Sequence, residues 1–191
     1  IIVPVRWKDV KSLTGEPENR ALRVLFMATS PLNVEPVLDF EREEGMVLTA
    51  TQRQPLSLTV EESGDLEELG NLVDSYEAGY FDVFHLTGHA HLTDDGARFL
   101  TETETGEKYD ATAEEIAEAL SRMPELIFLS GCHTGEAGKA GGVPSLAEEL
   151  LTLGAKAVLG WGRPVLDVEA SEAAAELYGA LSRGHELGRA A

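Results

Sequence analysis

The only cysteine of the chain, Cys132, lies in the glycine-rich stretch "LSGCHTGEAGKAGG" (129–142). Such a stretch could bind phosphate or present a nucleophile. A P-loop needs the pattern G-x-x-x-x-G-K-[ST], in which the final hydroxyl binds magnesium beside the lysine. The spacing would require glycine where the chain has His133, and Ala140 rather than a hydroxyl residue follows Lys139. The pattern therefore disfavours a phosphate site and directs attention to the thiol.

A histidine that could serve this thiol comes 43 residues earlier, at His89. His89 follows the apolar run "DVFHLTG", and Cys132 follows the apolar run "LIFLSG". If these runs are neighbouring strands, both side chains lie at the carboxyl edge of the sheet, where α/β proteins bind ligands. A cysteine thiol has a pKa of about 8.5, so a nucleophilic thiolate needs an adjacent base. The flanking Gly88, Ala90 and Gly131 leave backbone N–H groups open to a substrate carbonyl.

Other interpretations of the same residues stay open. A lone cysteine is often an inert core residue. The histidines make a metal site conceivable, but their spacing on a strand and a loop does not bring three imidazoles to one ion without special geometry. We expect no metal, with His85 in the core and His91 and His133 at the rim. A flavodoxin-like or response-regulator-like domain would need an acidic pair or a phosphate loop after the first strand, where "TSPLNVEP" stands instead.

The rest of the chain predicts elements that could position these residues. Short apolar runs at 22–29, 80–88, 126–131 and 155–162 are typical of buried strands, and "GMVLTAT" (45–51) is a weaker candidate. Amphipathic helices are expected near 65–80, 112–123, 145–154 and 168–183, two of them opened by capping boxes, Thr112 with Glu115 and Ser145 with Glu148. The alternation predicts an α/β domain with a mostly parallel central sheet and helices on both faces. "ARFLTETETGEKYDA" (97–111) predicts an inserted β-hairpin that turns at "ETGE".

Composition narrows the classes of partner. The 191 residues suit one domain, and 34 acidic against 15 basic residues give a formal net charge of −19. This charge argues against direct binding of nucleic acid or anionic lipid, because no basic field attracts phosphate. No stretch approaches the roughly 20 apolar residues of a membrane span. A single cysteine excludes an internal disulfide and suggests a reducing, cytoplasmic location.

The paired motifs resemble a known family. "DVFHLTGHA" followed by "LIFLSGCHTGE" is similar to the CHAT domain, a caspase-like cysteine peptidase module often fused to tetratricopeptide repeats, and 145–181 resembles its carboxyl-terminal half. The resemblance implies a caspase-like three-layer sandwich, with residues 1–20 as a linker from a longer protein and 21–191 as the peptidase domain. It implies His89 as general base and acid, Cys132 as nucleophile, and the backbone N–H groups of Ala90 and Cys132 as the oxyanion hole. The chain departs from the family at Ala90, where glycine is usual, although alanine keeps the N–H donor.

Related families suggest which residues could recognise substrate. Metacaspases, which cut after arginine or lysine, carry an aspartate two residues before the cysteine, where this chain has Ser130. In separases, a segment similar to "RPVLD" supplies an aspartate that binds the P1 arginine, and this nominates Asp167. The alternative is that Asp167 caps the last helix. Ser130, Asp167 and Glu136 are the substrate-binding candidates, and Asp94 could also line the cleft.

The resemblance implies a cysteine endopeptidase that acts on protein substrates and needs no cofactor. The loop at 133–143 contains four glycines and no large apolar side chain, so we expect it to order only when a partner packs on it. The family's repeat fusions suggest an upstream helical-repeat region in the same protein as one such partner. An activating protein or ribonucleoprotein is another, because some relatives act in bacterial defence. The alternative is a caspase-like scaffold that binds partners without catalysis.

Overall fold

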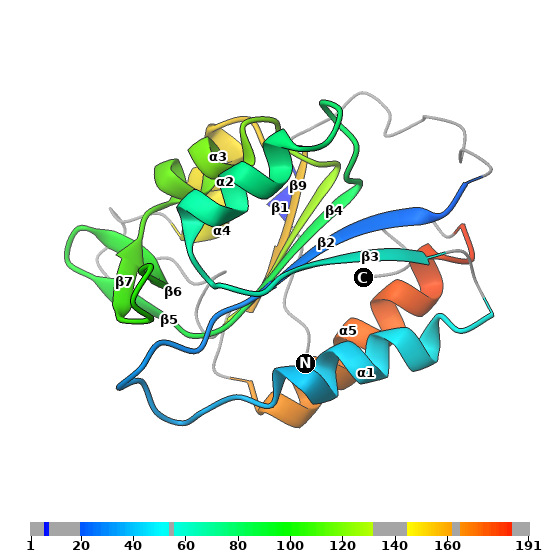
Figure 1. The fold of residues 1–191 in the computed structure, drawn as a ribbon, viewed down its shortest axis with the longest axis horizontal. Coiled ribbons are helices and arrows are strands. Elements are labelled where there is room, and N and C mark those ends of the chain that lie inside the picture. Colours follow the sequence, from blue (N-terminus) through cyan, green and yellow to red (C-terminus); the bar gives the residue numbers. More distant parts are fainter. Residues whose placement is uncertain (1–5, 8–19, 54–55, 132–144, 162–164, 185–191) are drawn as a thin grey trace.

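The computed structural model describes residues 6–7, 20–53, 56–131, 145–161 and 165–184 (Figure 1). Among these residues, strands alternate with helices except from β4 to β7 and from β1 to β2, where strands follow one another. No helix of the described part is long and apolar enough to cross a membrane. The strands are β1 (Arg6–Trp7), β2 (Leu22–Ala28), β3 (Leu56–Glu61), β4 (Val83–Thr87), β5 (Ala90–Thr93), β6 (Gly96–Glu102), β7 (Lys108–Ala111), β8 (Leu126–Ser130) and β9 (Ala157–Gly160). The helices are α1 (Phe40–Ala50), α2 (Leu66–Asp74), α3 (Ala113–Leu120), α4 (Leu146–Thr152) and α5 (Asp167–Leu181).

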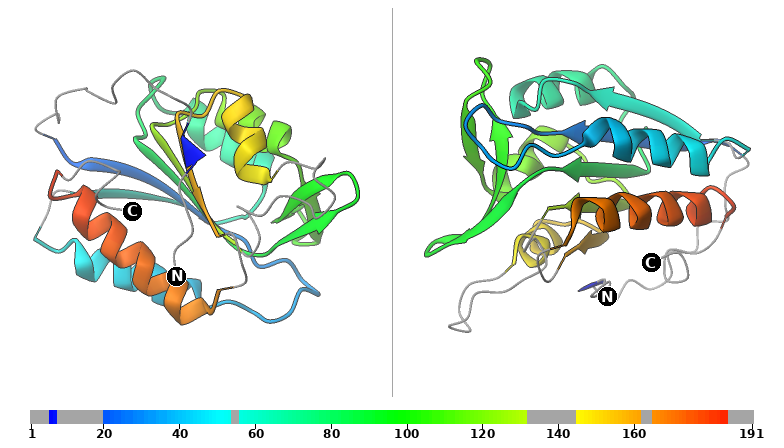
Figure 2. Two further views of the ribbon diagram at one scale, coloured as in Figure 1. Left: turned by 180° about the vertical axis from the view of Figure 1, so that it is seen from behind. Right: turned by 90° about the horizontal axis from the view of Figure 1, so that it is seen from below.

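A central sheet forms the middle layer of the described part of the molecule. Its six strands lie in the order β1-β9-β8-β4-β2-β3, and every pairing is parallel except that of β1 with β9. Helices α1 and α5 cover one face of the sheet, and α2, α3 and α4 cover the other (Figures 1 and 2). The predicted three-layer sandwich with a mostly parallel sheet is confirmed. Strand β1 comes from the segment 1–20 that the sequence assigned to a linker.

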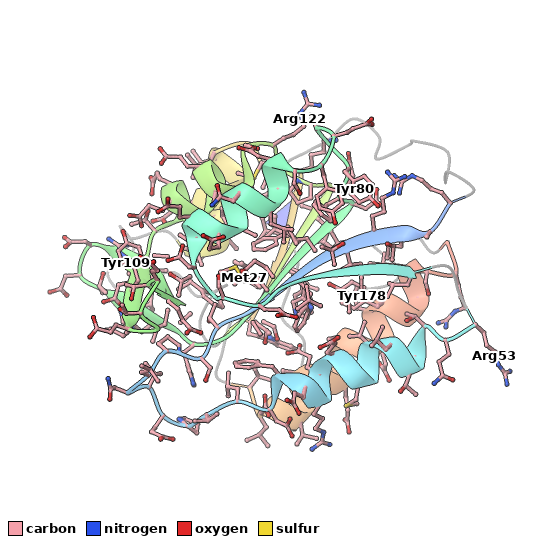
Figure 3. All side chains as sticks on the ribbon, in the orientation of Figure 1. Met27, Arg53, Tyr80, Tyr109, Arg122 and Tyr178 are labelled. Atoms are coloured by element: carbon pink, nitrogen blue, oxygen red, sulfur yellow. The ribbon has the colours of Figure 1, made fainter. Side chains whose placement is uncertain are left out.

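The hydrophobic core lies on both faces of this sheet. All five residues of β4 and all five of β8 are buried, as expected for parallel strands covered on both sides. Alternate side chains of a strand point to opposite faces. One cluster, with Met27 and Phe84, packs against α2, α3 and α4, and the other, with Phe128 and Tyr178, packs against α1 and α5. Figure 3 labels Met27 and Tyr178 on these two sides of the sheet.

The predicted hairpin at 97–111 is present as β6 and β7, which pair antiparallel. The sequence missed a third strand, β5, which pairs with β6 and makes a small sheet in the order β5-β6-β7 at one end of the molecule (Figure 1). Strand β5 has only four residues and starts directly after His89, so no apolar run announces it. The insertion therefore packs directly beside the end of β4.

The weak strand candidate at 45–51 is wrong, because these residues belong to α1 and its end. Val47 and Thr49 favour a strand locally. The helix forms because Asp39 caps it, its carboxylate accepting the Arg42 N–H at 3.1 Å, and because two glutamates in its first turn suit a helix amino terminus. The sequence analysis also missed β3, a partly buried edge strand that pairs with β2.

Both predicted capping boxes are present. Thr112 Oγ1 accepts the Glu115 N–H at 3.1 Å, and the Thr112 N–H donates to Glu115 Oε2 at 2.8 Å. Ser145 and Glu148 make the same reciprocal pair at 3.2 and 2.9 Å. These caps start α3 and α4 at the positions that the sequence indicated.

Replacing Thr112 with alanine is expected to lower the free energy of unfolding by about 1 kcal/mol, because the first turn of α3 loses its side-chain acceptor. Urea denaturation of the variant and the wild type measures this loss. The control is Thr105→Ala in the exposed turn between β6 and β7, which should change stability by no more than about 0.5 kcal/mol. Equal losses in the two variants would contradict the capping role.

Candidate active site

The two strands that precede His89 and Cys132 are direct neighbours. Strand β4 pairs with β8 in parallel, and their last residues, Thr87 and Ser130, lie opposite each other. His89 follows Thr87 by two residues, and Cys132 follows Ser130 by two residues. The expectation that both strands end at the same edge of the sheet is confirmed. Cys132 itself, like Glu136 and His133, lies outside the described residues.

Glycines allow the two strand ends to pack closely. The Gly88 N–H donates to Ser130 O at 3.2 Å. A Cβ at Gly88 would lie 2.1 Å from Thr29 Oγ1, and a Cβ at Gly131 would lie 2.8 Å from Phe99 Cε2. Only glycine avoids these overlaps. Steric hindrance therefore explains why glycine stands in "TGH" and "SGC" at the strand ends.

The His89 ring is held by a backbone carbonyl. Its Nε2 lies 2.7 Å from Pro36 O, in the loop between β2 and α1, and the side chain is half-buried. A carbonyl only accepts, so Nε2 carries the proton, and the lone pair of the neutral ring is on Nδ1. A ring fixed in this tautomer can take a proton at Nδ1. The sequence analysis missed Pro36, because a loop carbonyl leaves no signature in residue types.

The backbone N–H of Ala90 lies on the outer edge of the small sheet. The Leu100 N–H donates to His89 O at 2.8 Å, and the next pair along the ladder is Ala90 with Phe99. In an antiparallel ladder, bonded and non-bonded pairs alternate, so the N–H of Ala90 points away from β6. Because β5 is the edge strand of this sheet, no other strand of the sheet pairs with that N–H. The alanine at this position is therefore compatible with a donor to a substrate oxygen.

The remaining described histidines have other surroundings. His85 is fully buried, as expected for a core residue. His91 lies on β5, about 40% exposed, with Nε2 3.3 Å from Asp110 Oδ1. Among the described residues no group of three or more histidine, cysteine, aspartate or glutamate side chains could hold a metal ion. Asp94 lies in the exposed turn between β5 and β6.

Ser130 faces a buried carboxylate that the sequence analysis did not single out. Ser130 is 6% exposed, and its Oγ donates to Glu43 Oε1 at 3.3 Å. Thr87 Oγ1 donates to Glu43 Oε2 at 2.7 Å, and His85 Nε2 lies 3.4 Å from Oε1. Burial alone would raise the pKa of the Glu43 carboxyl, but its interaction with His85 and the hydrogen bonds from Thr87 and Ser130 outweigh burial and hold the pKa below its usual value. Glu43 is therefore ionised at neutral pH.

Asp167 lies at the amino end of α5 without capping it. The N-cap residue of α5 is Leu166, and among the described residues no side-chain hydrogen bond caps that end. The half-buried Asp167 carboxylate instead accepts the Asp39 N–H at 3.4 Å. Asp167 thus joins the start of α5 to the start of α1, on the face of the sheet that carries Glu43.

Comparison with known families agrees with the geometry. The family model of the CHAT domain matches residues 7–191, nearly the whole chain. No curated protein was found to match. The matched range includes both strand ends, the small sheet, and helix α1, which carries Glu43.

Proposed function

The chain belongs to the CHAT domain family, which is related to caspase-like peptidases, and from this premise we propose that it is a cysteine endopeptidase with His89 and Cys132 as its catalytic dyad. One observation carries the proposal. The His89 ring, oriented by Pro36 O, stands beside the end of β4, and β4 is paired in register with the strand that leads to Cys132. A base whose Nδ1 carries a lone pair at this edge is what a thiol nucleophile requires.

The proposed reaction has two steps. His89 takes the thiol proton, and the Cys132 sulfur forms a bond to the carbonyl carbon of the substrate peptide. The N–H groups of Ala90 and Cys132 stabilise the oxyanion, each such donor contributing about 3 kcal/mol. His89 gives its proton to the departing amine as the C–N bond breaks. Water, deprotonated by His89, then hydrolyses the thioester and releases the acid.

We also propose that cleavage is switched on by a partner. The support is the glycine-rich sequence 133–143 beside the nucleophile and the family's fusion to helical repeats. The partner would be an upstream helical-repeat region of the same protein or an activating protein or ribonucleoprotein in a bacterial cytoplasm, as in defence systems. The formal charge of −19 favours a basic contact surface on that partner.

The function is tested with the full-length protein, together with its activating partner where one co-purifies. A peptide library is cleaved by the wild type, and Cys132→Ala should lower kcat/KM by at least about 10³-fold, because the nucleophile is lost. An electrophilic peptide probe should label wild-type Cys132 faster than it labels free cysteine. Cleavage that persists in Cys132→Ala would contradict the dyad. Labelling no faster than that of free cysteine would instead indicate the silent scaffold.

A further inference from the structure

Glu43 places a charge beneath the two strand ends. The residue is 2% exposed, and it lies on the face of α1 that also buries Val47. The two carboxylate oxygens serve different strands. Oε2 accepts from Thr87 at the end of β4, whereas Oε1 accepts from Ser130 at the end of β8. One carboxylate therefore joins the two strands across the edge where they end.

The surroundings of this carboxylate are aromatic and closed. His85, which lies 3.4 Å from Oε1, stacks on Phe128 with a centroid distance of 4.5 Å and meets Phe26 edge-on at 4.9 Å. The Tyr178 hydroxyl is buried without a hydrogen-bond partner among the described residues, and burial together with the charge of Glu43 raises the pKa of Tyr178 well above its usual value. A charge in such surroundings is stable only with good partners, so its geometry is strongly restrained.

The same carboxylate is linked through its neighbours to two segments that position His89, the end of β4 and the loop before α1. Thr87 lies two residues before His89, and Ser130 lies two residues before Cys132. Glu43 also lies in the first turn of α1, and the loop that leads into α1 carries Pro36, whose carbonyl accepts from His89. None of these contacts reaches the reacting atoms. Glu43 acts only through its neighbours.

We propose that Glu43 is a positioning residue for the dyad, whose carboxylate fixes the ends of β4 and β8 and the start of α1 relative to one another. This proposal rests on the peptidase function proposed above. The charge and both oxygens are needed. In Glu43→Gln one oxygen becomes an NH₂ group, so one strand end loses its acceptor and the negative charge is removed. The strand ends then separate slightly, and a displacement of about 1 Å can cost about 10²-fold in rate.

The test compares Glu43→Gln with Val47→Ala in the full-length protein. Val47 is 1% exposed on the same helix, and its aliphatic side chain makes no hydrogen bond to Thr87 or Ser130. Val47→Ala therefore loses core packing alone. At a temperature where both variants are folded, Glu43→Gln should lower kcat about 10-fold or more with KM within about two-fold of the wild type. Val47→Ala should lower Tm but keep kcat within about two-fold of the wild type. A wild-type kcat in Glu43→Gln, or a change in KM alone, would overturn the positioning role.

A second measurement identifies the route. In a Thr87→Val, Ser130→Ala background, the effect of Glu43→Gln on kcat should shrink to within about two-fold, because the hydroxyls that transmit it are gone. An undiminished effect would overturn the proposal. If Glu43→Gln does not fold, the kcat values of Thr87→Val and Ser130→Ala are measured instead. A wild-type kcat in both variants would overturn the proposal. A wild type that does not cleave would overturn the peptidase function itself, a result distinct from all of these.

Discussion

Replacement of His89 by alanine is expected to lower kcat/KM for peptide cleavage by about 10²–10⁴-fold, the range that a positioned general acid–base contributes. The free energy of unfolding should change little, because the side chain is half-buried at the rim and its one described hydrogen bond goes to Pro36 O. Steady-state cleavage of the best library peptide gives the rate, and urea denaturation gives the stability.

The matched control is His91→Ala. His91 lies two residues further along the chain, and its described partner is the exposed Asp110. An exposed pair of this kind contributes at most about 1 kcal/mol, and cleavage should stay within about two-fold of the wild type. Equal losses of activity in the two variants would mean that the small sheet, and not the His89 imidazole, supports catalysis.

Gly88→Ala is expected to lower the free energy of unfolding by about 1–3 kcal/mol, as overpacked core positions do, and to abolish most cleavage. The new Cβ would lie 2.1 Å from Thr29 Oγ1 and 2.9 Å from Phe99 Cε1. Thr29 cannot move aside freely, because its hydroxyl donates to Leu100 O at 2.7 Å. Relief must come from the backbone that carries His89. Denaturation curves and cleavage rates of the purified variant measure both effects.

Gly45→Ala, at a second glycine, is expected to raise the free energy of unfolding rather than lower it. Gly45 lies within α1, and a Cβ there would meet nothing within 4 Å. Alanine in a helix interior is favoured over glycine by about 0.5–1 kcal/mol, so this variant should gain stability and retain activity. A similar loss in both variants would show that the close packing at Gly88 is not the cause.

Much of the fold was predictable because its determinants are local. Strands β4 and β8 are continuous apolar runs, and the caps at Thr112 and Ser145 use residues three positions apart. The place of His89 followed from one topological rule, that neighbouring parallel strands end at one edge of the sheet. These inferences need only the chain and its periodicity.

The rest of the site depends on contacts between distant segments. Glu43 lies in the sequence "FEREEG", where one glutamate cannot be told from its neighbours until α1 packs on the sheet. Pro36 contributes a carbonyl, a group that every residue has. The region 45–51 was misread for a related reason, because the preference of Val47 and Thr49 for strands is weaker than the cap at Asp39.

The pairing of Thr87 with Ser130 also protects the fold from misalignment during folding. If β4 slipped by one residue against its neighbours, each of its side chains would turn to the opposite face of the sheet. Leu86 would then meet the Glu43 carboxylate, leaving an ionised group facing hydrocarbon, an error that costs about 3–5 kcal/mol. Strands β4 and β8 consist mostly of similar apolar residues, and without this restraint they could pair in several registers. The buried Glu43 carboxylate therefore favours the alignment in which Thr87 and Ser130 both face it.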